Sequence, residues 1–236
     1  MIRRAHEDQS NDSEQARHDL VMRYAQAIRK YVAAILRDES SSEELAQEVI
    51  IRVLQGDFAS ADPERGRFRD FLKTVIRNMA RNHWNQQNRR KPVEFDVEQA
   101  GLIEGDAADS KDDWESVWRA EILELTWSAL QYEETQKPSG MAYTLLRLRS
   151  EHPDESSEQL AKRLGDRLNR VVRADALRQK LRRARVRFAE LLLMEIANGL
   201  TRATASDVEE ELVDLQLYRL VERLLPEDWR TRFFNS

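Results

Sequence analysis

Residues 68–91 read FRDFLKTVIRNMARNHWNQQNRRK, and this stretch carries two patterns at once. Its apolar residues recur at spacings of three and four: Phe68, Leu72, Val75 and Met79. This spacing predicts a helix with one buried stripe. Bases and amides occupy its other sides: Lys73, Arg77, Asn78, Arg81, Asn82 and Asn85. The stretch therefore predicts an amphipathic helix whose exposed surface is basic.

Two further helices are predicted upstream of this stretch. Apolar residues at helical spacing mark the first over residues 20–35. Ser41 and Glu44 have the spacing of a capping box, which predicts that the second begins there and ends near Gln55. Its inner face consists of Leu45, Val49 and Val53. Residues 56–66 contain proline and glycine and predict a loop.

The charge pattern reverses after residue 92. Between Glu94 and Glu115 the charged residues are acidic except for Lys111. Together with the glycines and small residues of this stretch, the charge predicts a flexible acidic linker, after which a second helical unit begins near Trp114.

The second unit is predicted to contain a short helix, a turn and a long helix. Ser156 and Gln159 form a second capping box before a helix over residues 158–164, and Gly165 occupies the place of a left-handed residue that ends a helix. The long helix is expected over about residues 174–196. Its inward stripe is Leu177, Leu181, Ala184, Phe188 and Leu191.

These patterns predict an all-α fold with two helical domains, a flexible acidic linker and a C-terminal helical extension. The extension is expected to form one helix over residues 206–225, with an apolar face of Val208, Leu212, Leu215 and Leu220. The predicted divisions are a disordered tail, the first domain, the linker, the second domain and the extension, over residues 1–15, 16–92, 93–113, 114–200 and 201–236.

Composition excludes several classes of protein. The chain of 236 residues has no Cys, and its four His form no helical ligand pair, so neither a metal site nor a cofactor is expected. There is no glycine-rich phosphate loop and no arrangement of nucleophile and base, so the chain is not expected to be an enzyme. No signal-peptide run and no stretch of roughly 20 apolar residues is present, so a cytoplasmic protein without a membrane partner is expected.

The basic residues are concentrated in two segments although the net charge is -5. The long helix of the second unit carries Arg178, Gln179, Arg182 and Arg185 on its outer face, which is the layout of a helix-turn-helix DNA reader. Arginines, asparagines and Trp84 in the first segment suit single-stranded nucleic acid. The alternative for the long helix of the second unit is an ordinary solvated face. The alternative for Trp84 and Phe68 is a position in the core.

Two segments together resemble region 2 of the sigma-70 family, especially the extracytoplasmic-function group. They are SSSEELAQEVIIRVLQGDF at residues 40–58 and DPERGRFRDFLKTVIRNMARNHWNQQNRRKP at residues 62–92. The resemblance covers about residues 20–92. It implies a sigma factor that binds RNA polymerase core through the β′ clamp helices and the β flap, and directs it to promoter DNA.

The resemblance also implies roles for individual residues. The predicted core-binding residues lie on the second helix: Glu44, Gln47, Glu48 and Arg52. The residues expected to bind the melted minus-ten element lie on the loop and third helix: Asp62, Arg65, Phe68, Arg77, Asn78, Arg81, Asn82, Trp84, Arg89 and Arg90. A flipped base would be held near the loop.

The second unit resembles region 4, which reads the minus-thirty-five element. The LAKRLG helix and the RRAR segment are kept, but residues 166–173 lengthen the turn between them. The residues expected to bind DNA here are Arg173, Arg178, Gln179, Arg182, Arg183 and Arg185. An anti-sigma factor or another regulator is a further candidate partner.

Two alternative functions fit the same helices. A free-standing helix-turn-helix regulator would bind double-stranded DNA without polymerase, normally as a symmetric dimer. A helical anti-sigma-like adaptor would bind no DNA, and its behaviour in DNA assays would not depend on salt.

Overall fold

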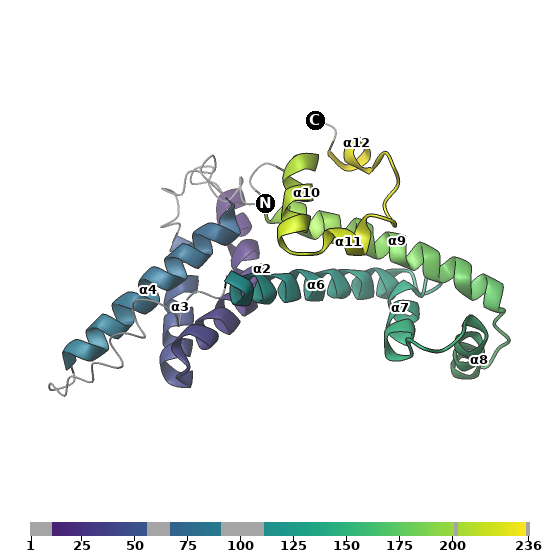
Figure 1. Ribbon diagram of the computed structural model, residues 1–236, viewed down its shortest axis with the longest axis horizontal. Helices are drawn as coiled ribbons and strands as arrows, with labels where there is room; N and C mark the ends of the chain where they lie inside the picture. Colours follow the sequence, from purple (N-terminus) through teal and green to yellow (C-terminus); the bar gives the residue numbers. More distant parts are fainter. Residues whose placement is uncertain (1–10, 56–66, 91–110, 201–202, 235–236) are drawn as a thin grey trace. The chain divides into compact units, whose positions relative to one another are not determined.

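The computed structural model describes residues 11–55, 67–90, 111–200 and 203–234, and the regular structure in these ranges is entirely helical (Figure 1). The all-α fold class is therefore confirmed. The helices are α2 (Asn11–Leu36), α3 (Glu39–Gln55), α4 (Phe68–Arg90), α6 (Lys111–Gln136), α7 (Ala142–Glu151), α8 (Ser157–Leu168), α9 (Ala174–Asn198), α10 (Ala205–Asp214), α11 (Tyr218–Val221) and α12 (Trp229–Phe234).

The chain divides into two compact units, and neither is continuous in sequence. Unit 1 comprises Met1–Glu121 and Ala197–Leu215, and unit 2 comprises Ile122–Ile196 and Gln216–Ser236. The divisions fall within helix α6 and near the end of α9. They differ from the predicted divisions at residues 113 and 200, because the start of α6 and the whole of α10 belong to unit 1.

Three predicted segments lie wholly or mostly outside the described residues: most of the tail, the loop and most of the acidic linker. Where the description resumes, α2 begins at Asn11 and α6 begins at Lys111. Both helices therefore start earlier than the apolar pattern predicted. A helix anchored by a buried face can extend through polar turns, since propagation is easier than nucleation.

Unit 1 is built on α2, α3 and α4. Helix α2 packs along α3, and α4 contacts both. The predicted inner face of α3 is confirmed, since Leu45, Val49 and Val53 are buried. On α4 the buried stripe is Phe68, Leu72, Ile76 and Met79. Val75 was predicted to be buried but is only half-buried, and Ile76 is buried instead. Both residues lie at a helical spacing from Leu72, so the sequence pattern did not distinguish them.

The first turns of α6 complete the core of unit 1. Trp118 stacks on Tyr24 with ring centroids 4.4 Å apart, and Trp114 packs against Tyr31 at 4.5 Å. Trp114 is 1% exposed. The prediction that a second, separate unit begins at Trp114 is therefore corrected: these rings bury their large apolar area against α2.

The start of α3 also differs from the sequence prediction. The helix begins at Glu39, and the Asp38 carboxylate accepts a hydrogen bond from the Ser41 backbone N–H at 2.8 Å. Asp38 is therefore the capping residue, and Ser41 lies inside the helix. Hydrogen bonds from Ser41 hold the pKa of Asp38 below its ordinary value.

Unit 2 has a leucine-rich core formed by the end of α6 with α7, α8 and α9. The capping box at the start of α8 is confirmed, because Ser156 Oγ accepts from Gln159 N–H and Gln159 Oε1 accepts from Ser156 N–H. The predicted inward residues of α9 are all buried: Leu177, Leu181, Ala184, Phe188 and Leu191. Leu145, Leu148, Leu160 and Leu164 belong to the same cluster.

Gly165 has a different role from the predicted one. Helix α8 continues through Gly165 to Leu168, and the left-handed residue at its end is Asn169, with φ of 49°. A Cβ on Gly165 would lie 2.7 Å from the backbone oxygen of Arg170. Glycine is required here because the chain after the helix folds back against it, and the turn between α8 and α9 is correspondingly shorter than predicted.

The C-terminal extension forms three short helices among the described residues rather than the one predicted over residues 206–225. Helix α10 ends before Gln216, which has φ of 57°. This left-handed residue changes the chain direction and the register of burial. Leu217 and Val221 are buried beyond it, while Leu220, predicted to be buried, is 48% exposed.

The pH dependence of stability tests one ion pair of unit 2. Arg187 Nε donates to Glu133 Oε2 at 2.9 Å, and this bond lowers the pKa of Glu133. A carboxylate with a lowered pKa stabilises the fold above the pKa of the unfolded chain, and the effect is lost as the pH falls through the folded-state pKa. We expect Glu133→Gln to lower the free energy of unfolding at pH 7 by under about 1 kcal/mol, since both partners are partly exposed.

Denaturant unfolding as a function of pH checks this prediction. The difference between wild type and Glu133→Gln should shrink as the pH falls below 4.5, the ordinary pKa of the group. A difference that stayed constant down to acid pH would show that the ion pair is not its cause.

Candidate nucleic-acid interface

Helix α3 presents a mixed polar and apolar face opposite its buried stripe. The four predicted residues on it are exposed: Glu44, Gln47, Glu48 and Arg52. Arg52 Nη2 donates to Glu48 Oε1 at 2.8 Å, so these two side chains hold each other in place. Such an exposed pair adds little stability, and it leaves the face available to a partner.

Two apolar residues on the same face were not predicted. Ile51 is 50% exposed and Leu54 is 40% exposed. They lie at helical spacing from Gln47, so one side of α3 combines carboxylates, an amide and apolar surface. The signal was available in the sequence, because both residues fall out of phase with the buried stripe of α3.

Helix α4 presents its predicted polar surface. Asn78, Arg81 and Asn82 are exposed, whereas Arg77 and Trp84 are half-buried. Arg89 and Arg90 fall in the last turn of α4, with side chains outside the described part. Asp62 and Arg65 also lie outside it.

Phe68 does not belong to this exposed surface. It is 6% exposed and its ring lies 5.9 Å from that of Tyr24. Its position at the first turn of α4 directs it into the core of unit 1. The prediction that Phe68 contacts DNA is therefore corrected, since a ring buried against α2 cannot stack on a base.

The outer face of α9 and the turn before it gather the cations of unit 2. All six predicted residues are exposed: Arg173, Arg178, Gln179, Arg182, Arg183 and Arg185. Two of them form ion pairs, Arg178 with Glu158 at 3.1 Å and Arg173 with Asp175 at 2.8 Å. The second pair is local to the turn, while the first ties α9 to the start of α8. The arrangement is a short helix, a turn and a longer helix with a basic outer face.

Part of this basic face is hollowed. Gln179, Arg182, Arg183, Val186, Arg187 and Glu190 line a depression of about 470 Å³ on α9. Its rim carries cations and an amide, groups that bind phosphates and base edges.

Within the described ranges, no group of three or more His, Asp or Glu side chains is placed to hold a metal ion. No helix there has the length and apolar character needed to span a membrane.

One family comparison covers the segment that contains α3 and α4. Residues 20–90 match the family model of sigma-70 region 2, a segment that includes α3, α4 and most of α2. No curated protein and no solved structure gives a significant match. The matched segment covers less than a third of the chain, and the match is to region 2 of the sigma-70 factors, which are non-enzymatic transcription initiation factors.

Proposed function

We propose that this chain is a sigma factor of the extracytoplasmic-function type, which binds RNA polymerase core in the cytoplasm and directs it to promoters. The observation that carries the proposal is the coincidence of the region 2 match with a helical unit whose α3 and α4 expose two different polar faces. A DNA-binding surface alone would not require the α3 face.

The α3 face suits a basic helical partner. Glu44 and Glu48 supply negative charge, Gln47 supplies hydrogen bonds, and Ile51 supplies apolar area near them. Charged groups at the edge of an interface guide association, while buried apolar contacts supply most of the affinity. We assign this face to the clamp helices of the β′ subunit.

The α4 face suits a melted promoter strand. Asn78, Arg81 and Asn82 offer hydrogen-bond donors and positive charge, and Trp84 lies in the next turn. Single-stranded DNA is held by cations along its backbone and by planar groups that stack on its bases. Asp62, Arg65, Arg89 and Arg90 belong to the same proposed site for the minus-ten element.

The α8 and α9 pair suits the duplex of the minus-thirty-five element. In a helix-turn-helix reader the second helix enters the major groove, where Arg can pair with guanine and Gln with adenine. Arg178, Gln179 and Arg182 occupy the outer face of α9. We propose that unit 2 contains region 4, with a longer turn than usual between the two helices.

Run-off transcription tests the function directly. Purified chain and core polymerase from the same organism would be incubated with a genomic promoter library. We expect transcripts that start at a defined set of promoters only when the chain is present. Tight binding to an operator duplex without core, and no transcript with core, would instead identify a free-standing regulator.

The α3 face can be tested separately from DNA binding. We expect Gln47→Ala with Glu48→Ala to reduce capture of core polymerase by about tenfold or more, because both side chains lie on the proposed contact surface. Both are exposed, so the fold should be retained. A pull-down with immobilised core measures the effect.

Unit 2 offers the matched control for this pull-down. Arg178→Ala with Arg182→Ala changes two exposed residues of α9. This variant should capture core like wild type and should lose transcription only from promoters that need the upstream element. Undiminished capture by the α3 variant would reject the assignment of that face.

A further inference from the structure

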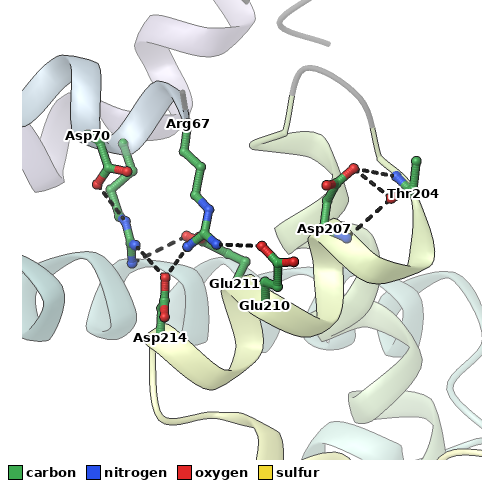
Figure 2. A network of polar contacts seen from close by, with 8 residues as sticks. Arg67, Asp70, Thr204, Asp207, Glu210, Glu211 and Asp214 are labelled. Atoms are coloured by element: carbon green, nitrogen blue, oxygen red, sulfur yellow. Dashed lines mark hydrogen bonds and ion pairs between the residues drawn. The ribbon is translucent and has the colours of Figure 1, made fainter. Parts of the chain in front are cut away.

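An acidic helix from the C-terminal extension is bound to the start of α4 in unit 1. Arg67 Nη1 donates to Glu211 Oε2 at 2.8 Å and also to Asp214, and Arg67 Nη2 donates to Glu210 Oε2 at 3.2 Å. Arg69 lies 3.4 Å from Glu211 and 3.7 Å from Asp214. Figure 2 shows the Arg67 guanidinium surrounded by these three carboxylates of α10. Arg67, directly before α4, and Arg69, in the first turn of α4, therefore face three carboxylates of α10.

The contact is buried but incompletely hydrogen-bonded. Arg69 and the Glu211 side chain are only 4% and 5% exposed. Among the described residues, Arg69 Nε and Nη1 have no hydrogen-bond partner. Burial raises the pKa of Glu211, with the two arginines acting in the opposite direction. Desolvation therefore offsets much of the attraction between these charges, and the contact is less stable than its number of ion pairs suggests.

Helix α10 is well formed as a ligand for these arginines. Thr204 and Asp207 cap its first turn reciprocally, and Val208 and Leu212 are fully buried. Its carboxylates at positions 210 and 211 each lie about one helical turn from the carboxylate at position 214. A row of oxygens at this spacing presents to the arginines the kind of charge that a nucleic-acid backbone presents.

The position of Arg67 links its binding to α10 with the proposed DNA-binding surface of α4. Arg67 lies inside the segment that matches region 2, directly before the first residue of α4. Asn78, Arg81 and Asn82 of the same helix are exposed. A guanidinium binds carboxylate and phosphate with the same fork of N–H donors. Arg67 therefore cannot bind the carboxylates of α10 and a phosphate fully at the same time.

We propose that Arg67 and Arg69 form a phosphate-binding site for promoter DNA, and that α10 is its intramolecular competitor. DNA binding by region 2 then requires release of α10, and the extension restrains the chain until it meets its promoter. The inference rests on the proposed function, since it takes region 2 to be a DNA-binding unit.

A charge-neutral set of substitutions in the full chain tests the competition. The variant carries Glu210→Gln, Glu211→Gln and Asp214→Asn. The control carries Glu222→Gln, Glu227→Gln and Asp228→Asn, which remove the same number of charges from exposed positions elsewhere in the extension. Binding of a fluorescent single-stranded oligonucleotide is measured by anisotropy at several salt concentrations.

We expect the α10 variant to bind the oligonucleotide about tenfold more tightly than wild type at low salt, with a slope against log salt steeper by about 1.4, as two new phosphate contacts require. The control should change affinity much less. Adding Arg67→Ala to the α10 variant should remove the gain. Equal affinities for a folded α10 variant and its control would overturn the proposal.

Hydrogen exchange on the wild-type protein keeps the test decisive if the α10 variant does not fold. Amides of α10 should exchange faster when the oligonucleotide is added, because the helix is displaced. Unchanged exchange under saturating oligonucleotide would also overturn the proposal.

Core capture is measured in parallel. Loss of core binding with preserved competition would reject the sigma function and leave the competition standing, and the reverse result would reject the competition alone.

Discussion

Trp114→Ala is expected to destabilise unit 1 by about 3–5 kcal/mol, the usual cost of removing a large buried aromatic side chain. Trp114 is 1% exposed and packs on Tyr31 and Trp118. Hydrogen exchange resolves where the effect falls. Amides in the buried part of α2 should exchange about a hundredfold faster or more, whereas those of α8 should keep their wild-type rates.

Trp114→Phe is the matched control for this prediction. The indole N–H of Trp114 is buried and has no hydrogen-bond partner among the described residues. Phenylalanine keeps aromatic area and removes that unsatisfied donor, so its loss of stability should be much smaller than that of alanine. If Trp114→Ala accelerated exchange in α8 and spared α2, the first turns of α6 would belong to the second unit.

Gly165→Ala is expected to destabilise unit 2 by about 1–3 kcal/mol, the range of an overpacked site. In most helices this change stabilises, by roughly 1 kcal/mol. Here the new Cβ would lie 2.7 Å from the Arg170 backbone oxygen, which cannot move as a flexible side chain can. The turn before α9 must shift to accommodate it. Denaturant unfolding of the full chain measures the change.

Gly140→Ala supplies the comparison for Gly165→Ala. A Cβ at Gly140 would lie 3.4 Å from the Lys137 backbone oxygen, which is close to ordinary van der Waals contact. Its effect on stability should be small. A gain in stability from Gly165→Ala would show that the helix propensity of alanine outweighs the contact, and that α8 and the turn are not closely packed.

Sequence periodicity predicted where helices lie better than it predicted what covers them. The stripe of α9 was correct because five apolar residues at regular spacing leave one choice of buried face. The partners of Trp114 were not predictable, since an apolar face does not specify which surface it meets. Gly165 shows the same limit at one position: a glycine that ends a helix and one that admits a neighbouring backbone look identical in sequence.

For the candidate surfaces, too, exposure could be predicted from the sequence and contacts between distant segments could not. Exposure of the α3 and α9 residues was predictable, because they lie opposite regular apolar stripes. The burial of Phe68 and the ion pairs of Arg67 were not, because both depend on contacts between segments far apart in the chain. Arg67 and its α10 partners are more than 140 residues apart in sequence.

The discontinuity of unit 1 has a consequence for how the protein is made. A ribosome releases α2, α3 and α4 first, when the rings that will cover Tyr24 and Tyr31 have not yet been translated. The α10 carboxylates that pair with Arg67 and Arg69 are translated later still. A nascent chain paused before residue 111 would display aromatic surface and unneutralised charge together, which makes it a candidate for chaperone capture or premature nucleic-acid binding.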